Sequence, residues 1–219
     1  MKKKTLAMFI VGGALTALFV ALIALLKTMD VAAIGPEGSE VGFSAFNKAC
    51  SVPMNDTWYK ITEYLGYCAI GIALGFALLA VIQAVKRKSV IKVDRDLLLL
   101  VGFECVLVAC YIAFDLVKIN YRPVIVEGEL EPSFPSTHTL IAVFVLFVSL
   151  KQAFLRMKKP AVKWTFCAIV TALCALIVVG RIVSGVHWMT DIIGGAILAA
   201  ALGVLYHACC SLVKDKDAR

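Results

Sequence analysis

The chain has 219 residues, of which 61% are hydrophobic and only 17% are charged. A water-soluble domain of this length does not need so much apolar surface, so the composition excludes a soluble globular protein and predicts a membrane protein. We attribute the formal net charge of +7 to basic loops on one side of a membrane, and we expect no nucleic-acid partner.

Six apolar stretches are long enough to cross a hydrocarbon core about 30 Å thick. In chain order they are residues 5–26, 65–85, 97–117, 140–155, 162–179 and 192–212. The first follows three lysines, so a signal peptide is the rival interpretation. It is long for the apolar region of a signal and lacks a clear small-residue cleavage site, which favours a retained anchor. The sequence therefore predicts an all-α polytopic protein with six transmembrane helices. We expect a single membrane-embedded domain, residues 1–219, with no internal repeat.

The distribution of basic residues predicts the orientation in the membrane. With the N-terminus inside, the inner segments hold Lys2, Lys3, Lys4, Lys86, Arg87, Lys88, Lys92, Arg95, Arg156, Lys158, Lys159, Lys163, Lys214, Lys216 and Arg219. The outer segments hold only Lys27, Lys48, Lys60, Lys118, Arg122 and Arg181. We therefore expect a multi-pass protein of the cytoplasmic membrane with both termini in the cytoplasm.

The first outer loop, residues 28–58, is long and rich in small residues. Short interfacial helices are compatible with it, and Trp58, Tyr59 and Tyr64 are candidate anchors at the lipid headgroups. Most of the eight cysteines lie inside apolar stretches, where cysteine acts as a small hydrophobic residue. A disulfide between Cys50 and Cys68 on the outer side is an alternative, although their spacing does not support it.

The first polar motif is Lys118-x3-Arg122-Pro123, at the end of the third stretch. If the helix continues, Lys118 and Arg122 share one face, one turn apart. Such a pair of cations indicates either an anion site or two charges that snorkel to the interface.

The second motif, Pro135-Ser136-Thr137-His138, opens the fourth stretch. With Pro135 in the first helical turn, the free amides that follow predict an anion site at the helix N-terminus. An ordinary N-terminal cap is the alternative for Ser136. The imidazole of His138 at the mouth of such a site is suited to general acid catalysis.

The third motif, Arg181-x5-His187-x3-Asp191, joins the last two stretches. On a helix, His187 and Asp191 share a face, so the carboxylate can orient one ring nitrogen and leave the other free to attack. The guanidinium of Arg181 can bind two phosphate oxygens. Under the predicted topology all three motifs, within residues 118–191, lie on the outer face.

These motifs resemble the signature of the type 2 phosphatidic acid phosphatase superfamily, in which Lys-x6-Arg-Pro, Pro-Ser-Gly-His and Ser-Arg-x5-His-x3-Asp follow one another. The resemblance implies a six-helix membrane phosphatase with an outward site, no metal and no cofactor. It implies that His187 attacks phosphorus and becomes phosphohistidine, that Asp191 orients it, and that His138 protonates the leaving oxygen. The phosphoryl oxygens would be held by Lys118, Arg122, Ser136, the Thr137 amide and Arg181.

The chain departs from the family pattern at three positions. Asp115 stands where the family has its lysine, and Lys118 could substitute from one turn further along, with Asp115 as its ion-pair partner. Thr137 replaces the family glycine and Gly180 replaces the family serine. Glu104, inside the third stretch, is about 27 Å from Arg122 by helical rise, so we expect a hydrogen-bonded or protonated structural glutamate.

The expected function is hydrolysis of a lipid phosphate or diphosphate on the outer face of the membrane. Undecaprenyl diphosphate is the first candidate, followed by phosphatidylglycerol phosphate and phosphatidic acid. Glu127, Glu129 and Glu131 are expected to be solvated loop charges, with exclusion of anionic headgroups as a further hypothesis. A lipid phosphotransferase on the same scaffold and a non-enzymatic anion transporter are the alternatives, and the sequence predicts no oligomeric state.

Overall fold

The computed structural model describes residues 3–213 and is built from helices, with no strand in that range beyond three isolated bridges. Lys2, Lys214, Lys216 and Arg219, counted above among the inner basic residues, lie outside the described range. Six helices are long and apolar enough to cross a membrane: α1 (Lys3–Leu26), α3 (Asp56–Lys86), α4 (Arg95–Leu116), α5 (Thr137–Arg156), α6 (Pro160–Val183) and α7 (Met189–Leu212). The prediction of six spanning helices is confirmed, and the protein is a multi-pass membrane protein.

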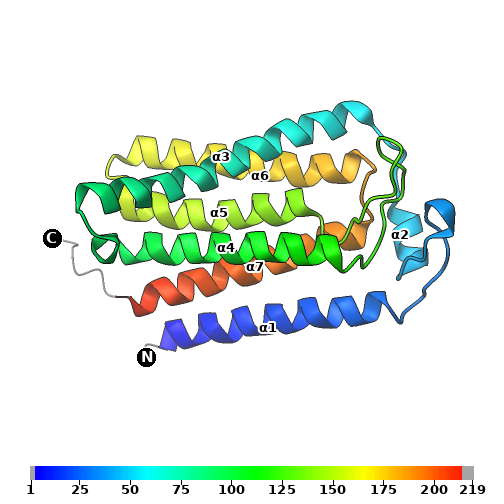
Figure 1. Ribbon diagram of the computed structural model, residues 1–219, viewed down its shortest axis with the longest axis horizontal. Helices are drawn as coiled ribbons and strands as arrows, with labels where there is room; N and C mark the ends of the chain where they lie inside the picture. The colour runs from blue at the N-terminus through cyan, green and yellow to red at the C-terminus, as the bar shows by residue number, and fades with distance from the viewer. Residues whose placement is uncertain (1–2, 214–219) are drawn as a thin grey trace.

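The six long helices run along the long axis of the molecule, and the longer loops gather at one end (Figure 1). This loop end holds the segments before α3, between α4 and α5, and between α6 and α7, together with the short helices η1 (Pro36–Gly38) and α2 (Ser44–Cys50). The opposite end holds the short η2 (Val90–Lys92) between α3 and α4. Helix α1 begins and α7 ends at that opposite end (Figure 1).

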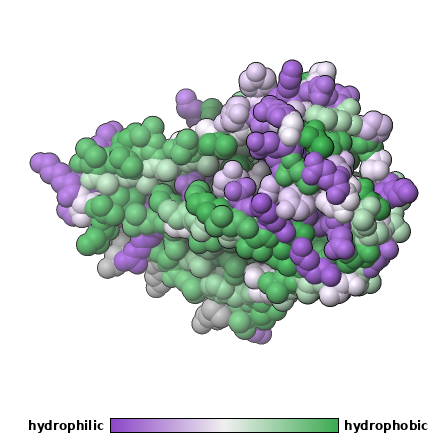
Figure 2. Space-filling model, turned by 45° about the vertical axis from the view of Figure 1, so that its right-hand side comes forward, coloured by the Kyte–Doolittle hydropathy of each residue, from purple (hydrophilic) through white to green (hydrophobic). Residues whose placement is uncertain are grey.

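Helix α7 is the centre of the bundle, because it packs against α1, α4, α5 and α6. Its buried positions include small residues such as Gly194, Gly195, Ala199 and Ala201. Small side chains let helices approach closely in a membrane, where burial of apolar surface does not drive helix association. Figure 2 shows a hydrophobic surface along the helices and polar residues concentrated at the loop end.

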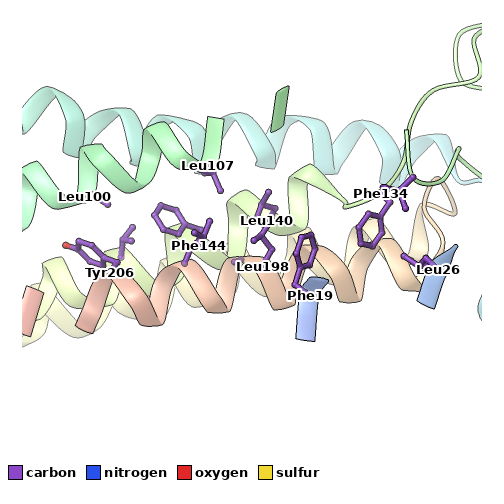
Figure 3. Packing of buried hydrophobic residues seen from close by; sticks show 13 residues of the cluster. Phe19, Leu26, Leu100, Leu107, Phe134, Leu140, Phe144, Leu198 and Tyr206 are labelled. Atoms are coloured by element: carbon purple, nitrogen blue, oxygen red, sulfur yellow. The ribbon is translucent and has the colours of Figure 1, made fainter. Parts of the chain in front are cut away.

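A continuous apolar cluster runs through the bundle (Figure 3). Near the loop end it contains Phe134, whose ring stacks on Phe19 of α1 at 5.8 Å between centroids and meets Phe114 of α4 edge-on at 6.2 Å. Phe134 directly precedes the second polar motif. Aromatic packing against two helices thus fixes the segment that leads into α5.

Three expectations about the first loop change. Helix α3 begins at Asp56 rather than near residue 65, because the Asn55 side chain caps it by accepting a hydrogen bond from the Trp58 amide at 3.1 Å. The stretch 56–64, expected in or beside the loop, is therefore helical. Throughout the described range the cysteines are free thiols, so Cys50 and Cys68 form no bridge. Tyr59 lies at the polar site described below and is not a free interfacial anchor.

At the opposite end, a polar network ties the α3–α4 hairpin to α5 and α7. The Arg156 guanidinium donates to Asp96 at 2.7 Å and to Asp94 at 3.1 Å. The Gln152 amide donates to Asp96 at 2.8 Å and to the Tyr206 hydroxyl at 2.6 Å. Shared charged hydrogen bonds of this kind stabilise a helix arrangement because each partner would otherwise be buried unpaired.

Candidate active site

A cavity of about 560 Å³ opens at the loop end, and the three polar motifs all contribute to its walls. It lies between α3, α4, the α4–α5 loop and the start of α5. The lining residues with polar groups include Tyr59, Glu63, Asp115, Lys118, Arg122, Thr137, His138 and His187.

His187 and Asp191 lie together, as expected from their spacing, but not on one helical face. His187 precedes α7, whose first residue is Met189, and Asp191 lies in the first turn of that helix. The His187 Nδ1 atom is 3.6 Å from Asp191 Oδ2, a distance slightly beyond a hydrogen bond. The carboxylate is held in place by the Trp188 amide, which donates to Oδ2 at 2.9 Å, and by the Asn120 side chain, which donates to Oδ1 at 3.2 Å.

Arg181 contacts His187 directly and is linked to His138 through Glu63. Its guanidinium is completely buried, and Nη2 lies 3.1 Å from His187 Nε2. The other nitrogen, Nη1, donates to Glu63 Oε1 at 3.1 Å and to the Thr62 hydroxyl at 3.2 Å. The His187 ring therefore presents Nδ1 to a carboxylate and Nε2 to a cation beside the cavity.

The structure separates Lys118 from Arg122, contrary to the shared helical face expected for them. Helix α4 ends at Leu116, and Lys118 is an exposed residue with a positive φ of 28°. It lines the cavity from the loop, as does Asp115, and no ion pair joins these two described residues. Arg122 lies deeper and pairs with Glu131 at 2.9 Å. Glu131 is thus an ion-pair partner rather than a solvated loop charge.

The aromatic ring of Tyr59 lies beneath both guanidinium groups, with Arg181 at 5.4 Å and Arg122 at 6.0 Å from the ring centroid. A ring face attracts a cation and holds it without occupying its hydrogen-bond donors. Tyr59 therefore positions two like charges side by side.

The second motif adopts a helix start that differs in register from the expected one. Helix α5 begins at Thr137 with Ser136 as its N-cap, so Pro135 lies outside the first turn. The Ser136 amide is not free, because it donates to the Asp191 carbonyl at 3.0 Å. This bond joins the start of α5 to the start of α7, and it leaves the amides of Thr137, His138 and Thr139 without a helical acceptor.

Glu63 is the residue that the sequence motifs did not reveal. It lies in the second turn of α3, and its Oε1 atom is 3.4 Å from His138 Nε2 as well as 3.1 Å from Arg181 Nη1. The one available signal was an acidic residue just before an apolar stretch, which is commonplace at a membrane boundary. Asn120 and Thr62 were likewise missed, since Asn120 is an unspecified position of the first motif and Thr62 belongs to no motif.

The packing around Gly180 explains why this chain has glycine where the family has serine. A Cβ at this position would lie 2.5 Å from Thr62 Cγ2 and 3.2 Å from Trp58 Cε3. Helices α3 and α6 are therefore in contact where the family carries a side chain. The Thr62 methyl group occupies that space, and its hydroxyl contacts Arg181.

Several buried donors of the site have no partner within the protein. They are Arg122 Nε and Nη1, Arg181 Nε and the Ser136 hydroxyl. Buried donors are normally satisfied, so a convergent group of unsatisfied ones indicates a binding site for an anion. Burial of the imidazole, followed by the charges of Arg181 and Arg122, holds the pKa of His187 well below its ordinary value of 6.5. The ring is therefore neutral at pH 7.

Comparison with protein families identifies the family of the chain. The family model described as the PAP2 superfamily matches residues 105–214, which is half of the chain and contains all three motifs. The chain belongs to the PAP2 superfamily. This membership confirms the resemblance seen in the motifs and supports a phosphatase activity.

A PAP2 fold is also found among solved structures. One matching structure is the "Crystal structure of the first transmembrane PAP2 type phosphatidylglycerolphosphate phosphatase from Bacillus subtilis", with a TM-score of 0.61 and 19% sequence identity. The match covers 94% of this chain and 98% of that chain, so the two share the fold over nearly their whole length. No curated protein matches the chain.

Proposed function

We propose that this PAP2 membrane protein is a lipid phosphatase that hydrolyses a phosphate or diphosphate headgroup through a phosphohistidine on His187. The observation that carries the proposal is the placement of the His187 ring, with Nδ1 towards Asp191 and Nε2 beside Arg181 at the wall of the cavity. A nucleophilic histidine needs an unprotonated nitrogen facing the substrate and an acceptor behind the other nitrogen. The placement of His187 between Asp191 and Arg181 supports both requirements.

The phosphoryl group would be held by the unpaired donors around the cavity. Arg122, Arg181 and the Ser136 hydroxyl supply buried donors, and the Thr137 amide adds a helix N-terminus. Charge develops on the phosphoryl oxygens during transfer, so donors already in place stabilise the transition state without reorganisation. Lys118, which is exposed on the loop, would contribute from the rim and not from the floor of the site.

A second, largely apolar groove of about 400 Å³ supports a lipid substrate. It shares Glu63, Tyr111, Thr137 and His138 with the polar cavity, and it continues between α3, α4 and α5. A headgroup in the cavity could therefore extend its chain into the groove. Undecaprenyl diphosphate stays our first candidate. The structural neighbour, a phosphatidylglycerolphosphate phosphatase, supports phosphatidylglycerol phosphate as the second, and phosphatidic acid is the third.

Glu104 lies in this groove and not in a hydrogen-bonded structural site. Its Oε1 atom is buried without a partner, which contradicts the expected hydrogen-bonded state, whereas the expected protonated state stays a prediction. Residues 104, 107, 108 and 111 form one face of α4, spaced as helical neighbours. Glu104 is thus about 10 Å deeper along the helix than Tyr111, where it would meet the lipid chain and not the phosphate.

The distribution of charge supports a site on the outer face of the membrane. Basic residues such as Arg87, Lys92, Arg156 and Lys163 lie at the end opposite the cavity. An excess of basic residues marks the cytoplasmic side, so the cavity would face outward and both termini would be cytoplasmic.

Activity of the purified full-length protein on lipid phosphates, with a chelator present, tests the proposal. We expect His187→Asn to lower kcat by about 10³-fold or more, and we expect acid-labile labelling of the wild type by a phosphate-labelled lipid. His207→Asn is the matched control, because His207 packs against Phe147 inside the bundle and should keep its activity. Wild-type rates in His187→Asn would refute the mechanism, and transfer of label to an added lipid alcohol in place of water would identify a phosphotransferase.

The groove is tested separately with Ala73→Trp, which fills it from α3. We expect loss of activity on long-chain lipid phosphates but not on a short-chain phosphate. Ala175→Trp is the control, because Ala175 is exposed on the outer side of α6. Equal losses on both chain lengths would contradict a role of the groove in binding the lipid tail.

A further inference from the structure

We infer that Glu63 is a positioning residue that orients His138 and favours its protonated form as the acid of the reaction; this inference rests on the proposed function. Glu63 Oε1 contacts His138 Nε2 at 3.4 Å and Arg181 Nη1 at 3.1 Å. No other carboxylate lies within ion-pair distance of His138 among residues 3–213. The site therefore contains two histidine–carboxylate pairs, Glu63–His138 and Asp191–His187.

The charges around His138 explain why a carboxylate is needed there. Two guanidinium groups, Arg181 and Arg122, share the site, and both disfavour a proton on a neighbouring imidazole. Burial acts in the same direction, since the His138 side chain is only 19% exposed. Glu63 supplies the negative charge that counters these effects. Asp191 cannot do so, because it contacts His187 and accepts hydrogen bonds from Trp188 and Asn120.

The packing of α3 also determines how the His138 ring is turned. A Cβ at Gly66, one turn after Glu63, would lie 2.6 Å from His138 Cδ2 and 2.8 Å from Nε2. The Nε2 edge of the ring thus rests against α3, where only glycine leaves room for it. The other nitrogen, Nδ1, is buried and has no partner in the protein. An imidazolium held this way donates one N–H to Glu63 and keeps the second for the leaving oxygen.

The two steps of the reaction balance with Glu63 ionised throughout. In the first step, the His187 Nε2–phosphorus bond forms, the bond from phosphorus to the lipid oxygen breaks, and the proton of His138 moves to that oxygen. In the second step, water attacks phosphorus, the phosphorus–nitrogen bond breaks, and neutral His138 takes the proton from water. Glu63 stabilises His138 whenever it is charged and neither gains nor loses a proton.

The leaving group distinguishes this role from a structural one. A lipid alcohol is a poor leaving group that needs a proton, whereas 4-nitrophenolate departs without one. We expect Glu63→Gln to lower kcat on a lipid monophosphate by about 10²-fold, the usual size of a general-acid contribution. With 4-nitrophenyl phosphate we expect the pre-steady-state burst of 4-nitrophenolate, which reports the first step alone, to change by less than about 5-fold. His138→Ala should show the same pattern, and adding Glu63→Gln to it should cause little further loss because the two act as a unit.

A second variant and a second measurement guard against a trivial loss of folding. Gly66→Ala leaves Glu63 and Arg181 in place but displaces the His138 ring, so it should reproduce the leaving-group pattern. Removing the negative charge beside Arg181 should also make orthophosphate a stronger inhibitor of Glu63→Gln than of the wild type. Equal losses of the first-step rate of Glu63→Gln on both substrates, with an active wild type, would overturn the role of Glu63 alone. A wild type that hydrolyses neither substrate would overturn the proposed function and this inference with it.

Discussion

Helices α3 and α6 are in close contact at Gly180, beside the hydrogen bond between Thr62 and Arg181. The substitution Gly180→Ala, which adds one carbon atom, tests this contact. The Cβ introduced by Gly180→Ala would lie 2.5 Å from Thr62 Cγ2, well inside van der Waals contact. Thr62 cannot rotate away easily, because its hydroxyl donates to the Trp58 carbonyl at 2.9 Å and β-branched side chains have restricted rotamers in helices. Overpacking of this kind costs about 1–3 kcal/mol.

Gly180→Ala also has a stabilising effect on the helix, which must be separated from the cost of overpacking. Alanine is favoured over glycine in a helix by about 1 kcal/mol. Thr62→Ser removes Cγ2 but keeps the hydroxyl that contacts Arg181, so it is the matched background. We expect Gly180→Ala to destabilise the wild type more than it destabilises Thr62→Ser, in which only the 3.2 Å contact with Trp58 Cε3 remains. The coupling energy between the two positions should be about 1–3 kcal/mol.

The coupling is measured by thermal unfolding, in one detergent, of the wild type, Gly180→Ala, Thr62→Ser and the double variant. For a chain of this length, 1 kcal/mol corresponds to a Tm shift of about 2–4 °C, so the two backgrounds should differ by several degrees. Activity should follow stability, because the displaced Thr62 would no longer support the guanidinium. If Gly180→Ala shifts Tm by the same amount and sign in both backgrounds, the helices do not meet as closely as described.

Three further predictions concern separate parts of the molecule. In the free protein labelled with ¹⁵N-histidine, the His187 ring should stay neutral as the pH falls through 6.5, because its folded pKa is lowered by burial and by nearby cations; an apparent pKa at or above 6.5 would contradict this. Arg122→Gln should lower kcat/KM on a lipid phosphate by about 10²-fold or more, whereas Lys118→Gln should raise KM only a few-fold; equal losses would place both cations in the same role. At the opposite end, Arg156→Gln should destabilise the fold by about 1.5–3 kcal/mol, because its hydrogen bonds to Asp96 are lost. At a temperature where the protein is folded, kcat should be unchanged. A lower kcat under those conditions would link this network to the site.

The sequence motifs located most of the candidate site. His187, Asp191, His138, Arg122 and Arg181 were expected at one membrane face. The fold places Arg122, His138 and His187 on the wall of one cavity, with Arg181 and Asp191 buried beside His187. Spacing alone was a poor guide to their local structure. Lys118 lies outside the helix that was expected to hold it, because α4 ends two residues earlier, and His187 precedes α7 instead of lying on it.

Glu63 is a site residue that no sequence motif could predict, because its contacts are with residues far away in the chain. It is 118 residues from Arg181 in the chain, yet the two side chains are 3.1 Å apart. Nothing in its neighbourhood on α3 distinguishes it from an ordinary acidic residue at a helix end. Its partners come from α5 and α6, which reach it only after the helices have packed.

Hydrophobicity and length by themselves determined the class of this protein and its six helices, and short segments determined its polar motifs. These properties follow from the thickness of the bilayer and from the local chemistry of each segment. The tertiary structure decided which charges are buried together, how His138 and His187 are turned, and that an apolar groove leads away from the cavity. Those properties depend on contacts between helices far apart in the chain, and such contacts are set by close packing at positions such as Gly66 and Gly180.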